Sequence, residues 1–300
     1  MTTITILDGY TLNPGDLSWE SMLAIGNCKI YDRTPIQQII ERSIDSEIII
    51  TNKTPLQKET LYSLPKLKYI GVIATGYNMI DIQAAKAKNI PVCNVPGYSG
   101  MSVAQAVFSL ILELTNHVGQ HSDEVRNGKW SSSPDFSFAS TPLIELANLT
   151  MGVVGYGNIA QNTIKIAQAL GMKILVHTRT LPTNQIDRVS FVSLEDLFKN
   201  SDIISLHCPL IDQTMNMINA NSLTLMKKTA ILINTGRGPL VDEKALAHAL
   251  NENRLFGAGL DVLSQEPPLA NNPLLTAKNC IIRPHNAWAS KAARQRLLNR

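Results

Sequence analysis

Residues 149–180, LTMGVVGYGNIAQNTIKIAQALGMKILVHTRT, decide the fold of this chain. Their apolar start, Met151 to Val154, is typical of a strand buried on both faces. A glycine-rich turn over 155–160 leads into a predicted helix, and residues 173–177 form the next predicted strand. The turn carries the pattern G-x-G-x-x-A, which matches the dinucleotide-binding fingerprint in its structural context. That context favours a dinucleotide site over the alternative, a purely structural glycine turn.

Each small residue of this fingerprint has a physical task. Gly155 permits the tight turn, and Gly157 removes a side chain so that backbone can approach a pyrophosphate. Ala160 stands where a third glycine is usual and is still small enough for close helix–strand packing. The free N–H groups and the dipole of the helix N-terminus favour phosphates. We therefore expect contacts to a dinucleotide from Gly155, Tyr156, Gly157, Asn158 and Ile159.

The end of the second strand indicates which dinucleotide is bound. NAD is usually held through its ribose 2′-OH by an acidic residue about 20 positions past the glycines. Here Thr178 stands in that place and Arg179 and Thr180 follow, with no carboxylate. A hydroxyl next to a guanidinium suits a 2′-phosphate, because arginine binds phosphate through charge-assisted bidentate hydrogen bonds. Residues 178–180 therefore favour NADP over NAD; the alternative makes Arg179 a solvated loop charge that stacks on adenine.

The composition is that of a globular protein, with 300 residues of which 44% are hydrophobic and 17% charged. This length suggests about two domains. The net charge is only +3 and the basic residues are dispersed, which argues against nucleic acid or an anionic membrane as a partner. No signal peptide and no apolar run near about 18 residues is found. The cysteines are isolated and lack metal-ligand spacing, so we expect buried, reduced thiols of a cytoplasmic protein: Cys28, Cys93, Cys208 and Cys280.

The first hundred residues alternate short strands and helices, which predicts a compact parallel α/β domain. The predicted strands are 3–7, 29–31, 47–50, 69–74 and 90–94, and the predicted helices are 16–25, 35–43, 56–64 and 80–88. Thr75, Gly76 and Tyr77 follow one of these strands and could turn backbone N–H groups towards a small anion, because open α/β sheets bind ligands at strand carboxyl ends. The alternative reading of this segment is a plain strand–helix turn.

The same alternation continues to the end of the chain. The predicted strands are 203–206, 230–234, 257–262 and 279–283, and the predicted helices are 194–198, 222–226 and 243–250. Between the two halves, residues 101–118 are predicted as one long apolar helix of the interdomain core. The aromatic loop 128–142 could line a substrate cleft or pack against the neighbouring domain.

Reactive side chains follow separate strands of the second half, where a doubly wound sheet binds its ligands. They are Arg237, Asp261, Glu266 and His285. A guanidinium can bind the carboxylate of a 2-oxo acid and polarise its carbonyl, and an imidazole can deliver a proton near neutral pH. Glu266 could hydrogen-bond the imidazole, and Asp261 could accept the NH₂ group of a nicotinamide carboxamide. Each residue alone has an ordinary structural reading, but the combination predicts hydride transfer to a 2-oxo acid.

Six motifs in this order make the chain similar to the D-isomer-specific 2-hydroxyacid dehydrogenases. They are NVPGYSGMSVAQ (94–105), GVVGYGNIA (152–160), HCPLIDQT (207–214), INTGRGPLVDE (233–243), GLDVLSQEPP (259–268) and RPHNAWAS (283–290). The resemblance covers nearly the whole chain. Within the family, the motifs around 207, 233 and 285 are most similar to those of glycerate dehydrogenases, that is, hydroxypyruvate reductases.

The resemblance implies a role for each matching residue. Arg237 would bind substrate, His285 would be the proton donor with Glu266 as its partner, and the N–H groups of Thr75 and Gly76 would bind the substrate carboxylate. Further dinucleotide contacts would come from His207, Cys208, Pro209, Thr214, Thr235, Gly236, Asp261 and Ala287. The resemblance also implies hinges near 94–102 and 285–289. A homodimer is expected, with the helix 101–118 and the loop after it as the contact surface.

Alternation and resemblance together predict two doubly wound parallel-sheet domains with a cleft between them. The flavodoxin-like substrate domain comprises residues 1–97 plus 287–300, and the Rossmann cofactor domain comprises residues 98–286. The predicted reaction transfers hydride between NAD(P)H and a small 2-oxo or D-2-hydroxy acid, above all hydroxypyruvate or glyoxylate. Two alternatives use the same fold: a dinucleotide-sensing binding protein, and an enzyme for another substrate such as formate or phosphite.

Three features depart from the family pattern. Gln105 replaces a common glutamate near the hinge, and Thr178 replaces the aspartate that is usual for NAD. The chain is also shorter after His285 than family members usually are. Residues 292–300 are therefore expected to form a shortened version of the helix that returns to the first domain.

Overall fold

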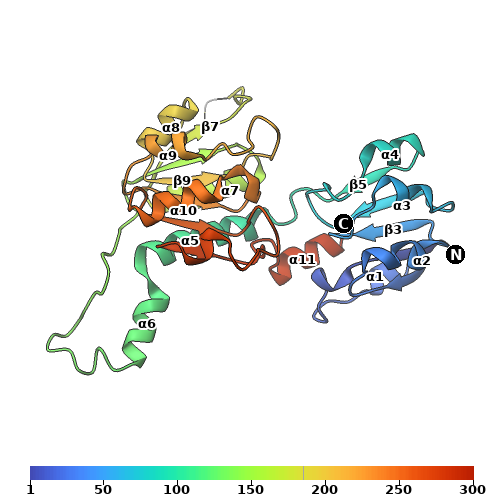
Figure 1. Cartoon of the computed structure of the whole chain (residues 1–300), viewed down its shortest axis with the longest axis horizontal. Helices are drawn as coiled ribbons and strands as arrows, with labels where there is room; N and C mark the ends of the chain where they lie inside the picture. Colours follow the sequence, from blue (N-terminus) through green and yellow to red (C-terminus); the bar gives the residue numbers. More distant parts are fainter. Residues whose placement is uncertain (185) are drawn as a thin grey trace. The chain divides into compact units, whose positions relative to one another are not determined.

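The computed structural model describes residues 1–184 and 186–300. These residues form two compact units (Figure 1): a first unit of Met1–Ser99 with Ala289–Arg300, and a second unit of Gly100–Trp288. The chain therefore leaves the first unit at 99/100 and returns to it at 288/289. The division predicted from the sequence, at 97/98 and 286/287, lies two residues earlier at each crossing.

The first unit contains a five-stranded parallel sheet in the order β2-β1-β3-β4-β5. Its strands are β1 (Thr3–Ile6), β2 (Asn27–Ile30), β3 (Ile48–Thr51), β4 (Tyr69–Val72) and β5 (Val92–Asn94). Its helices are η1 (Gly9–Thr11), α1 (Glu20–Leu23), η2 (Ile36–Gln38), α2 (Ile39–Ser43), α3 (Lys58–Tyr62), α4 (Ile82–Ala87) and α11 (Lys291–Leu298). This order is the flavodoxin-like, doubly wound arrangement that the sequence predicts, and its direction reverses between β1 and β3.

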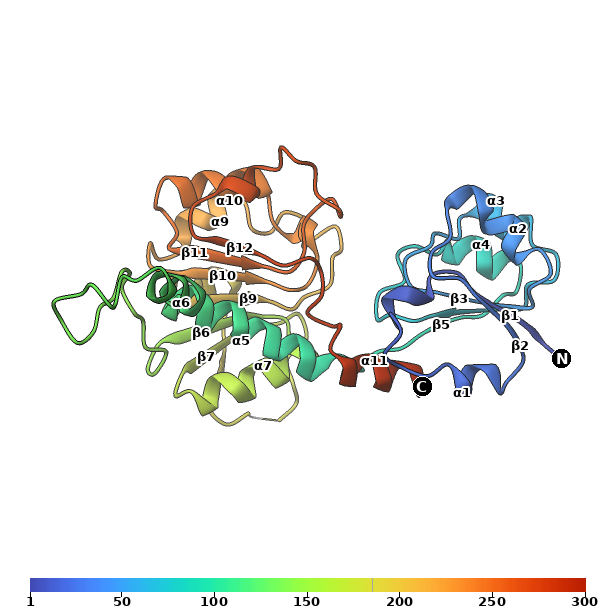
Figure 2. The ribbon, with the colours of Figure 1, turned by 90° about the horizontal axis from the view of Figure 1, so that it is seen from below.

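Apolar layers cover both faces of this sheet. On the face of α2, α3 and α4, Ile49, Leu61 and Ile70 are completely buried. On the face of α1, Ile4 and Ile6 pack with side chains of that helix. Figure 2 shows these two helical layers on opposite sides of the strands. Strands buried on both faces read as continuous apolar runs, which explains why the sequence reveals them.

Electrostatic contacts attach the carboxyl-terminal helix α11 to the first unit. Arg294 is only 8% exposed. Its guanidinium donates two hydrogen bonds of 2.7 Å to the Asp16 carboxylate and one of 3.0 Å to the Leu12 carbonyl. The guanidinium lowers the pKa of Asp16 below its usual value. Arg296 donates in the same way to the Tyr98 carbonyl, at 2.8 Å.

The second unit contains a seven-stranded parallel sheet in the order β12-β11-β10-β9-β6-β7-β8. Its strands are β6 (Thr150–Val154), β7 (Lys173–His177), β8 (Val189–Phe191), β9 (Ile203–Leu206), β10 (Ile231–Asn234), β11 (Gly257–Leu260) and β12 (Cys280–Ile282). Its helices are α5 (Gly100–Asn116), α6 (Val118–Arg126), α7 (Asn158–Ala169), α8 (Leu194–Asn200), α9 (Ala220–Leu225), η3 (Gly238–Leu240), α10 (Glu243–Asn251) and η4 (Pro273–Thr276). This is the Rossmann order, and it reverses between β6 and β9.

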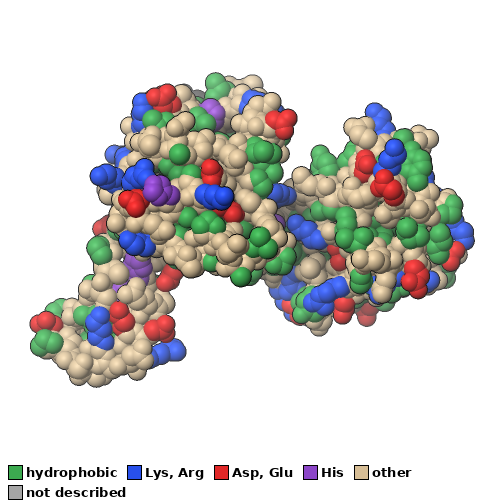
Figure 3. Space-filling model, in the orientation of Figure 1, with side chains coloured by type: hydrophobic (Ala, Val, Ile, Leu, Met, Phe, Trp, Pro, Cys, Tyr) green, Lys and Arg blue, Asp and Glu red, His purple; other side chains and the backbone are tan. Residues whose placement is uncertain are grey.

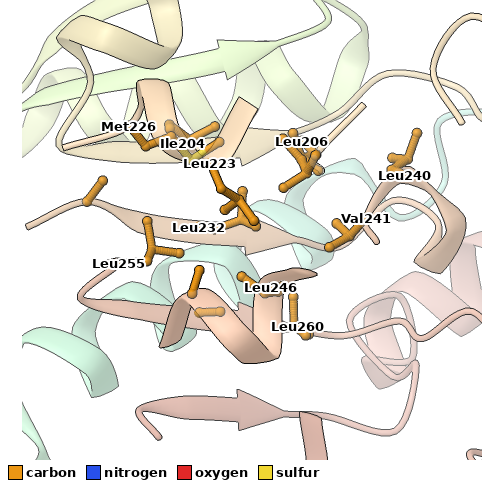
Figure 4. Packing of buried hydrophobic residues seen from close by; sticks show 14 of the residues in the cluster. Ile204, Leu206, Leu223, Met226, Leu232, Leu240, Val241, Leu246, Leu255 and Leu260 are labelled. Carbon is orange, nitrogen blue, oxygen red and sulfur yellow. The ribbon is translucent and has the colours of Figure 1, made fainter. Parts of the chain in front are cut away.

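Two apolar cores hold this sheet in the middle of three layers. One core joins the strands to α8, α9 and α10; Leu206, Leu223, Leu232 and Leu246 belong to it (Figure 4). The other core joins the opposite face to α5 and α7, and Figure 2 shows the two layers on either side of the strands. Because every pair of neighbouring strands is parallel, their carboxyl ends lie at the same edge of the sheet.

The region after residue 100 differs from its prediction as one helix over 101–118. Helix α5 ends at Asn116, because His117 has a left-handed backbone with φ of 48°, and α6 then starts in a new direction. Helix α6 and the following loop, residues 118–145, project from the sheet as an arm (Figure 1). The sequence did not reveal α6, since its residues have no buried face to impose an apolar period.

Other departures are local. The four cysteines were expected to be buried, but Cys93 is exposed and the other three are only partly buried. The helix predicted over 16–25 is reduced to α1, and no strand was predicted for β8, which has only three residues at the sheet edge. None of the helices among residues 1–184 and 186–300 is long and apolar enough to cross a membrane.

Candidate active site

The glycine turn after β6 lies at the point where the sheet order reverses. The φ angle of Gly155 is 99°, a left-handed value that favours glycine. A Cβ atom at Gly155 would also lie 2.7 Å from the His207 carbonyl oxygen, which follows β9. The backbone N–H of His207 donates to the Val154 carbonyl at 2.8 Å. Gly155 is therefore required both by its own conformation and by the close approach of the neighbouring loop.

The next glycine leaves room for a ligand. Apart from the chain neighbours of Gly157, no described residue has a heavy atom within 4 Å of a Cβ built on it, and Gly157 is exposed. Gly157 is the N-cap of α7 and has no side chain to cap the helix N–H groups. Ala160, one turn further, is completely buried. This combination of an open cradle and an uncapped 12-residue helix fits the pyrophosphate of a dinucleotide.

The loop after β7 carries the residues that are expected to contact the ribose. Thr178 is partly buried and Arg179 is exposed. The Thr178 hydroxyl donates to the Thr180 carbonyl at 3.4 Å. Tyr156 packs edge-on against Phe191 of β8, with ring centroids 5.5 Å apart, so β8 supports this side of the turn.

The turn after β10 places Arg237. Asn234, which is 1% exposed, accepts from the Gly236 N–H at 3.0 Å and donates to the Arg237 carbonyl at 2.9 Å. The Arg237 guanidinium donates to the Gly236 carbonyl at 2.8 Å. No carboxylate of the described residues forms an ion pair with this guanidinium. Asn234 was not among the expected site residues, although the spacing Asn-x-Gly at a strand end is a turn signal.

Close backbone packing brings this turn against the loop that carries Glu266. A Cβ on Gly238 would overlap the carbonyl carbon and oxygen of Leu263 and the N atom of Ser264. Only glycine tolerates such an approach. The loop after β11 is further held by Glu243 of α10, which accepts from the Ser264 N–H at 2.6 Å.

A hydrogen-bonded pair of a carboxylate and an imidazole lies at the carboxyl-terminal edge of the seven-stranded sheet. The Nδ1 atom of His285 lies 2.6 Å from Oε2 of Glu266, and Oε1 of Glu266 accepts from the Leu263 N–H at 3.2 Å. A carboxylate accepts only, so Nδ1 of His285 carries the proton. The contact expected between these two side chains is therefore present. Both side chains are partly open to solvent, with exposures of 24% for His285 and 35% for Glu266.

Asp261 holds the loop that bears His285. Its carboxylate is 1% exposed and accepts from the N–H groups of Asn286 and Ala287 at 3.0–3.1 Å. Its own carbonyl accepts from the His285 N–H at 2.8 Å. Burial raises the pKa of Asp261, an effect that the hydrogen bonds from Ala287 oppose. The sequence predicts that Asp261 also contacts a nicotinamide carboxamide. In that case the carboxylate would bind the carboxamide in addition to the N–H groups of its own loop.

A further residue that sequence analysis missed supports the same loop. The Trp288 indole N–H donates to the His285 carbonyl at 3.0 Å. His285 has a left-handed φ of 50°, uncommon for a residue other than glycine. The bonds from both sides of the loop maintain this conformation. Trp288 stands inside the motif RPHNAWAS, but nothing in the motif indicates its partner.

The remaining expected cofactor residues lie at the same edge of the sheet. The Thr214 hydroxyl donates to the Pro209 carbonyl at 2.7 Å and so closes the loop after β9. Burial raises the pKa of the Cys208 thiol to about 11, which keeps it protonated. The Thr235 hydroxyl is buried without a hydrogen-bond partner among the described residues. An unsatisfied buried hydroxyl is costly, so Thr235 is a candidate contact for a ligand.

In the first unit, Thr75, Gly76 and Tyr77 follow β4. Asn94 donates to the Thr75 carbonyl at 2.6 Å, and the Val95 N–H donates to the Ala74 carbonyl at 3.0 Å. These bonds hold the loop at the carboxyl end of the sheet. Thr75 and Tyr77 are exposed there, as a substrate-binding loop requires.

The second unit thus has the fold and the cradle of a nicotinamide-dinucleotide oxidoreductase. The open Gly157, the uncapped helix α7 and the unsatisfied Thr235 hydroxyl fit a dinucleotide, and the pair formed by Glu266 and His285 fits proton transfer. These features define the class of protein.

Known proteins place the chain more narrowly. The model of the D-isomer specific 2-hydroxyacid dehydrogenase, NAD binding domain, matches residues 108–287. The chain is 47% identical over 300 residues to a hydroxypyruvate reductase of Blautia hydrogenotrophica, covering 99% of this chain and 93% of that one. It is 42% identical over 261 residues to a glycerate dehydrogenase of Methylorubrum extorquens, covering 86% and 81%. Among solved structures, an acyclic imino acid reductase in complex with NADPH and D-Arg is 33% identical, with a TM-score of 0.85 and coverages of 99% and 94%.

The chain belongs to the D-isomer specific 2-hydroxyacid dehydrogenase family. It is an NAD(P)-dependent oxidoreductase of 2-hydroxy acids, as the motifs predicted, and it is similar to hydroxypyruvate reductases and glycerate dehydrogenases.

His207, at the reversal of the sheet order, leads to a prediction about acid stability. Its Nε2 atom lies 2.9 Å from the Ser205 hydroxyl, and burial lowers the pKa of His207 to about 4. In the unfolded chain a histidine titrates near about 6.5, so the unfolded state binds the additional proton between these values. The contribution of His207 to the free energy of unfolding is therefore fully present above about pH 6.5. It falls by up to about 3 kcal/mol as the pH drops towards 4.

The check is the free energy of unfolding of His207→Gln, measured by urea denaturation between pH 7 and pH 4.5. We expect the variant to lose less stability over this range than the wild type. The exposed His248 provides the matched control, His248→Gln, which should keep the wild-type slope. Equal slopes for His207→Gln and the wild type would contradict the assignment.

Proposed function

We propose that this chain is a hydroxypyruvate reductase that also runs in reverse as a D-glycerate dehydrogenase. The hydrogen-bonded pair of His285 and Glu266, at the edge where Arg237 also stands, carries this proposal. The printed names of the two sequence relatives support hydroxypyruvate and D-glycerate as the substrate pair. Glyoxylate, which shares the 2-oxo acid group, is the second expected substrate.

Arg237 is the proposed cation that binds the substrate carboxylate. Arg237 has five N–H donors, of which one contacts its own turn, so bidentate donors remain for a carboxylate. A guanidinium at this point also stabilises negative charge on the carbonyl oxygen during reduction. The N–H groups of Thr75 and Gly76 are proposed as further donors to the carboxylate.

His285 is the proposed proton donor. Because Nδ1 donates to Glu266, Nε2 is the atom that can serve the substrate oxygen. In the reducing direction a protonated Nε2 gives its proton to the developing alkoxide, and in the oxidising direction the neutral Nε2 accepts the hydroxyl proton. Glu266 and Asp261 do not touch the substrate in this scheme. They are positioning residues that fix the ring and its loop.

The dinucleotide would be held by the turn after β6 and by the strand-end loops beside it. A bound nicotinamide dinucleotide supplies the hydride to C2 of the oxo acid, or accepts it in the reverse reaction. Gly157 and the start of α7 would take the pyrophosphate, and the Thr235 hydroxyl would gain a partner. Thr178 and Arg179 in place of an acidic residue favour NADPH over NADH in this proposal. The four free thiols favour the cytoplasm as the compartment.

We also propose that a second copy of the chain covers the arm formed by residues 118–145. Within the arm, Ser140 bonds Lys129 at 2.5 Å and also bonds Glu124, so the arm has internal order. Its apolar side chains are nevertheless exposed: Val118, Val125, Trp130, Phe136 and Leu143. In Figure 3 the arm forms a lobe distinct from the body of its unit. Exposed apolar groups on a projecting element are typical of a protein–protein contact.

Removal of the proposed proton donor tests the chemistry. We expect His285→Gln to lower kcat for hydroxypyruvate by about 10²- to 10⁴-fold, the usual range for loss of a general acid. Dinucleotide affinity, measured by quenching of intrinsic fluorescence, should stay near the wild-type value. His248→Gln removes an exposed imidazole and should leave kcat unchanged. A kcat of His285→Gln within about threefold of the wild type would refute the assignment.

Cofactor choice is tested at Arg179. We expect Arg179→Ala to raise KM for NADPH about tenfold or more, since a hydrogen-bonded charge pair is lost, and to leave KM for NADH unchanged. Arg188, with a side chain that is 79% exposed, provides the matched control Arg188→Ala. An unchanged KM for NADPH in Arg179→Ala would remove the argument for 2′-phosphate recognition.

The proposed role of the arm as a dimer contact is tested by measuring the mass of the protein in solution. Phe136 is 91% exposed, and we expect Phe136→Ser combined with Trp130→Ser to convert a dimer to a monomer in sedimentation velocity. Leu275→Ser changes an exposed leucine outside the arm and should preserve the dimer. A monomeric wild type, or a double variant that stays dimeric, would contradict the proposed contact.

A further inference from the structure

Arg283 stands directly after β12, shortly before His285 in the chain. Its N–H donates to the Leu260 carbonyl at 2.8 Å, and its own carbonyl accepts from the His285 N–H at 3.1 Å. The backbone of Arg283 is therefore fixed by β11 on one side and by the loop of His285 on the other. Its side chain is 29% exposed, so most of it lies within the unit.

The guanidinium of Arg283 has partners on two other elements. Its Nη1 atom donates to the Ser109 hydroxyl of α5 at 3.3 Å, and its Nε atom lies 3.9 Å from Oδ1 of Asp261 at the end of β11. The first contact is a hydrogen bond, whereas the second distance is that of an ion pair. The Ser109 hydroxyl donates to the Ala106 carbonyl at 2.8 Å, which leaves its lone pairs to accept from Arg283. Arg283 thus joins the ends of β11 and β12 to the long helix α5.

The buried carboxylate of Asp261 needs a positive charge nearby. It is 1% exposed, and it accepts hydrogen bonds from the neutral N–H groups of Asn286 and Ala287. A buried charge is costly unless it is paired. Burial raises the pKa of Asp261, and the hydrogen bond from Ala287 and the charges of His285 and Arg283 oppose this rise. Two cationic side chains therefore act on this carboxylate.

Of these two cations, only Arg283 keeps its charge throughout the reaction. In the proposed scheme His285 is protonated before the substrate is reduced and neutral afterwards, whereas a guanidinium stays protonated at every accessible pH. If Asp261 took up a proton, its carboxyl group would lose acceptor capacity towards the N–H groups of the loop. The left-handed backbone of His285, with φ of 50°, would then be held less firmly.

We propose that Arg283 is a positioning residue for the proton donor: it supplies the permanent charge that keeps Asp261 ionised, and it fastens the end of β12 to α5. This inference rests on the proposed function, in which His285 gives its proton to a 2-oxo acid. Arg283 acts through Asp261 and the loop of His285 and needs no contact with the substrate. Such a role predicts a change in the pH dependence of the reaction, which a uniform structural effect would not produce.

The test is the pH profile of kcat for hydroxypyruvate with NADPH, measured with the full-length wild type, Arg283→Gln and Arg283→Lys. Each enzyme is kept near neutral pH and transferred to the assay pH, so that initial rates are recorded before any acid unfolding. Arg283→Gln removes the charge and keeps an N–H donor for Ser109. We expect its acid limb to move up by about one pH unit or more, because an opposite charge within about 4–6 Å lowers a carboxyl pKa by at least that amount. Arg283→Lys keeps the charge and should keep the acid limb within about half a unit of the wild type.

Arg254→Gln is the matched control, because Arg254 is an exposed arginine after α10 and its loss should leave the profile unchanged. A second comparison uses Asp261→Asn, which has no carboxylate to titrate. In that background Arg283→Gln should cause no shift of the acid limb. The comparison also serves if Arg283→Gln alone does not fold, since both members of the ion pair are then neutral.

An acid limb of Arg283→Gln at the wild-type position would overturn the proposal. An equal loss of kcat at every pH would also overturn it, since Arg283 would then have only a structural role. A shift caused by Arg283→Gln in the Asp261→Asn background would do the same, because the charge would act on another group. A wild type that does not reduce hydroxypyruvate would instead remove the proposed function itself, so the two failures are distinguishable.

Discussion

The buried carboxylate of Asp261 is the contact on which the candidate site depends. It sits at the end of β11 and accepts the N–H groups of the two residues after His285, at the end of β12. Without it, the loop would have to keep the left-handed backbone of His285 by other means. Removing a carboxylate from water is unfavourable, and the hydrogen bonds that it receives offset this cost. The site is therefore specified by a group that need not touch the substrate.

The first unit also has a buried aspartate that holds a neighbouring loop through its N–H groups. Asp8, at the end of β1, accepts three consecutive N–H groups of the loop after β3, those of residues 52–54. In both units a buried aspartate at one strand end shapes the loop that follows a neighbouring strand. A loop attached to a rigid sheet in this way loses less conformational freedom when a ligand binds. The two aspartates are thus positioning groups for the loops that follow the neighbouring strands.

Much of the fold and of the site could be predicted from the sequence. The apolar runs of β6, β9 and β10 identify buried parallel strands, and the glycine fingerprint gives the turn and the start of α7. Arg237, Glu266 and His285 are candidates because reactive side chains follow strand ends, and the structure brings Glu266 and His285 within 2.6 Å of each other. Elements without a buried face were not found. The three-residue strand β8 and the exposed helix α6 leave no apolar period, and the bend at His117 depends on a single backbone angle.

The sequence by itself determined the class of fold, the dinucleotide fingerprint and the family, because these depend on local patterns and ordered motifs. Only the tertiary structure decided which groups meet. Asp8 and Lys53 are 45 positions apart, and Gly238 approaches Leu263 across two strand ends. Such pairs form because parallel strands bring all their carboxyl ends to one edge, whatever their separation along the chain. The register of the strands, which no local pattern records, sets the distances between them.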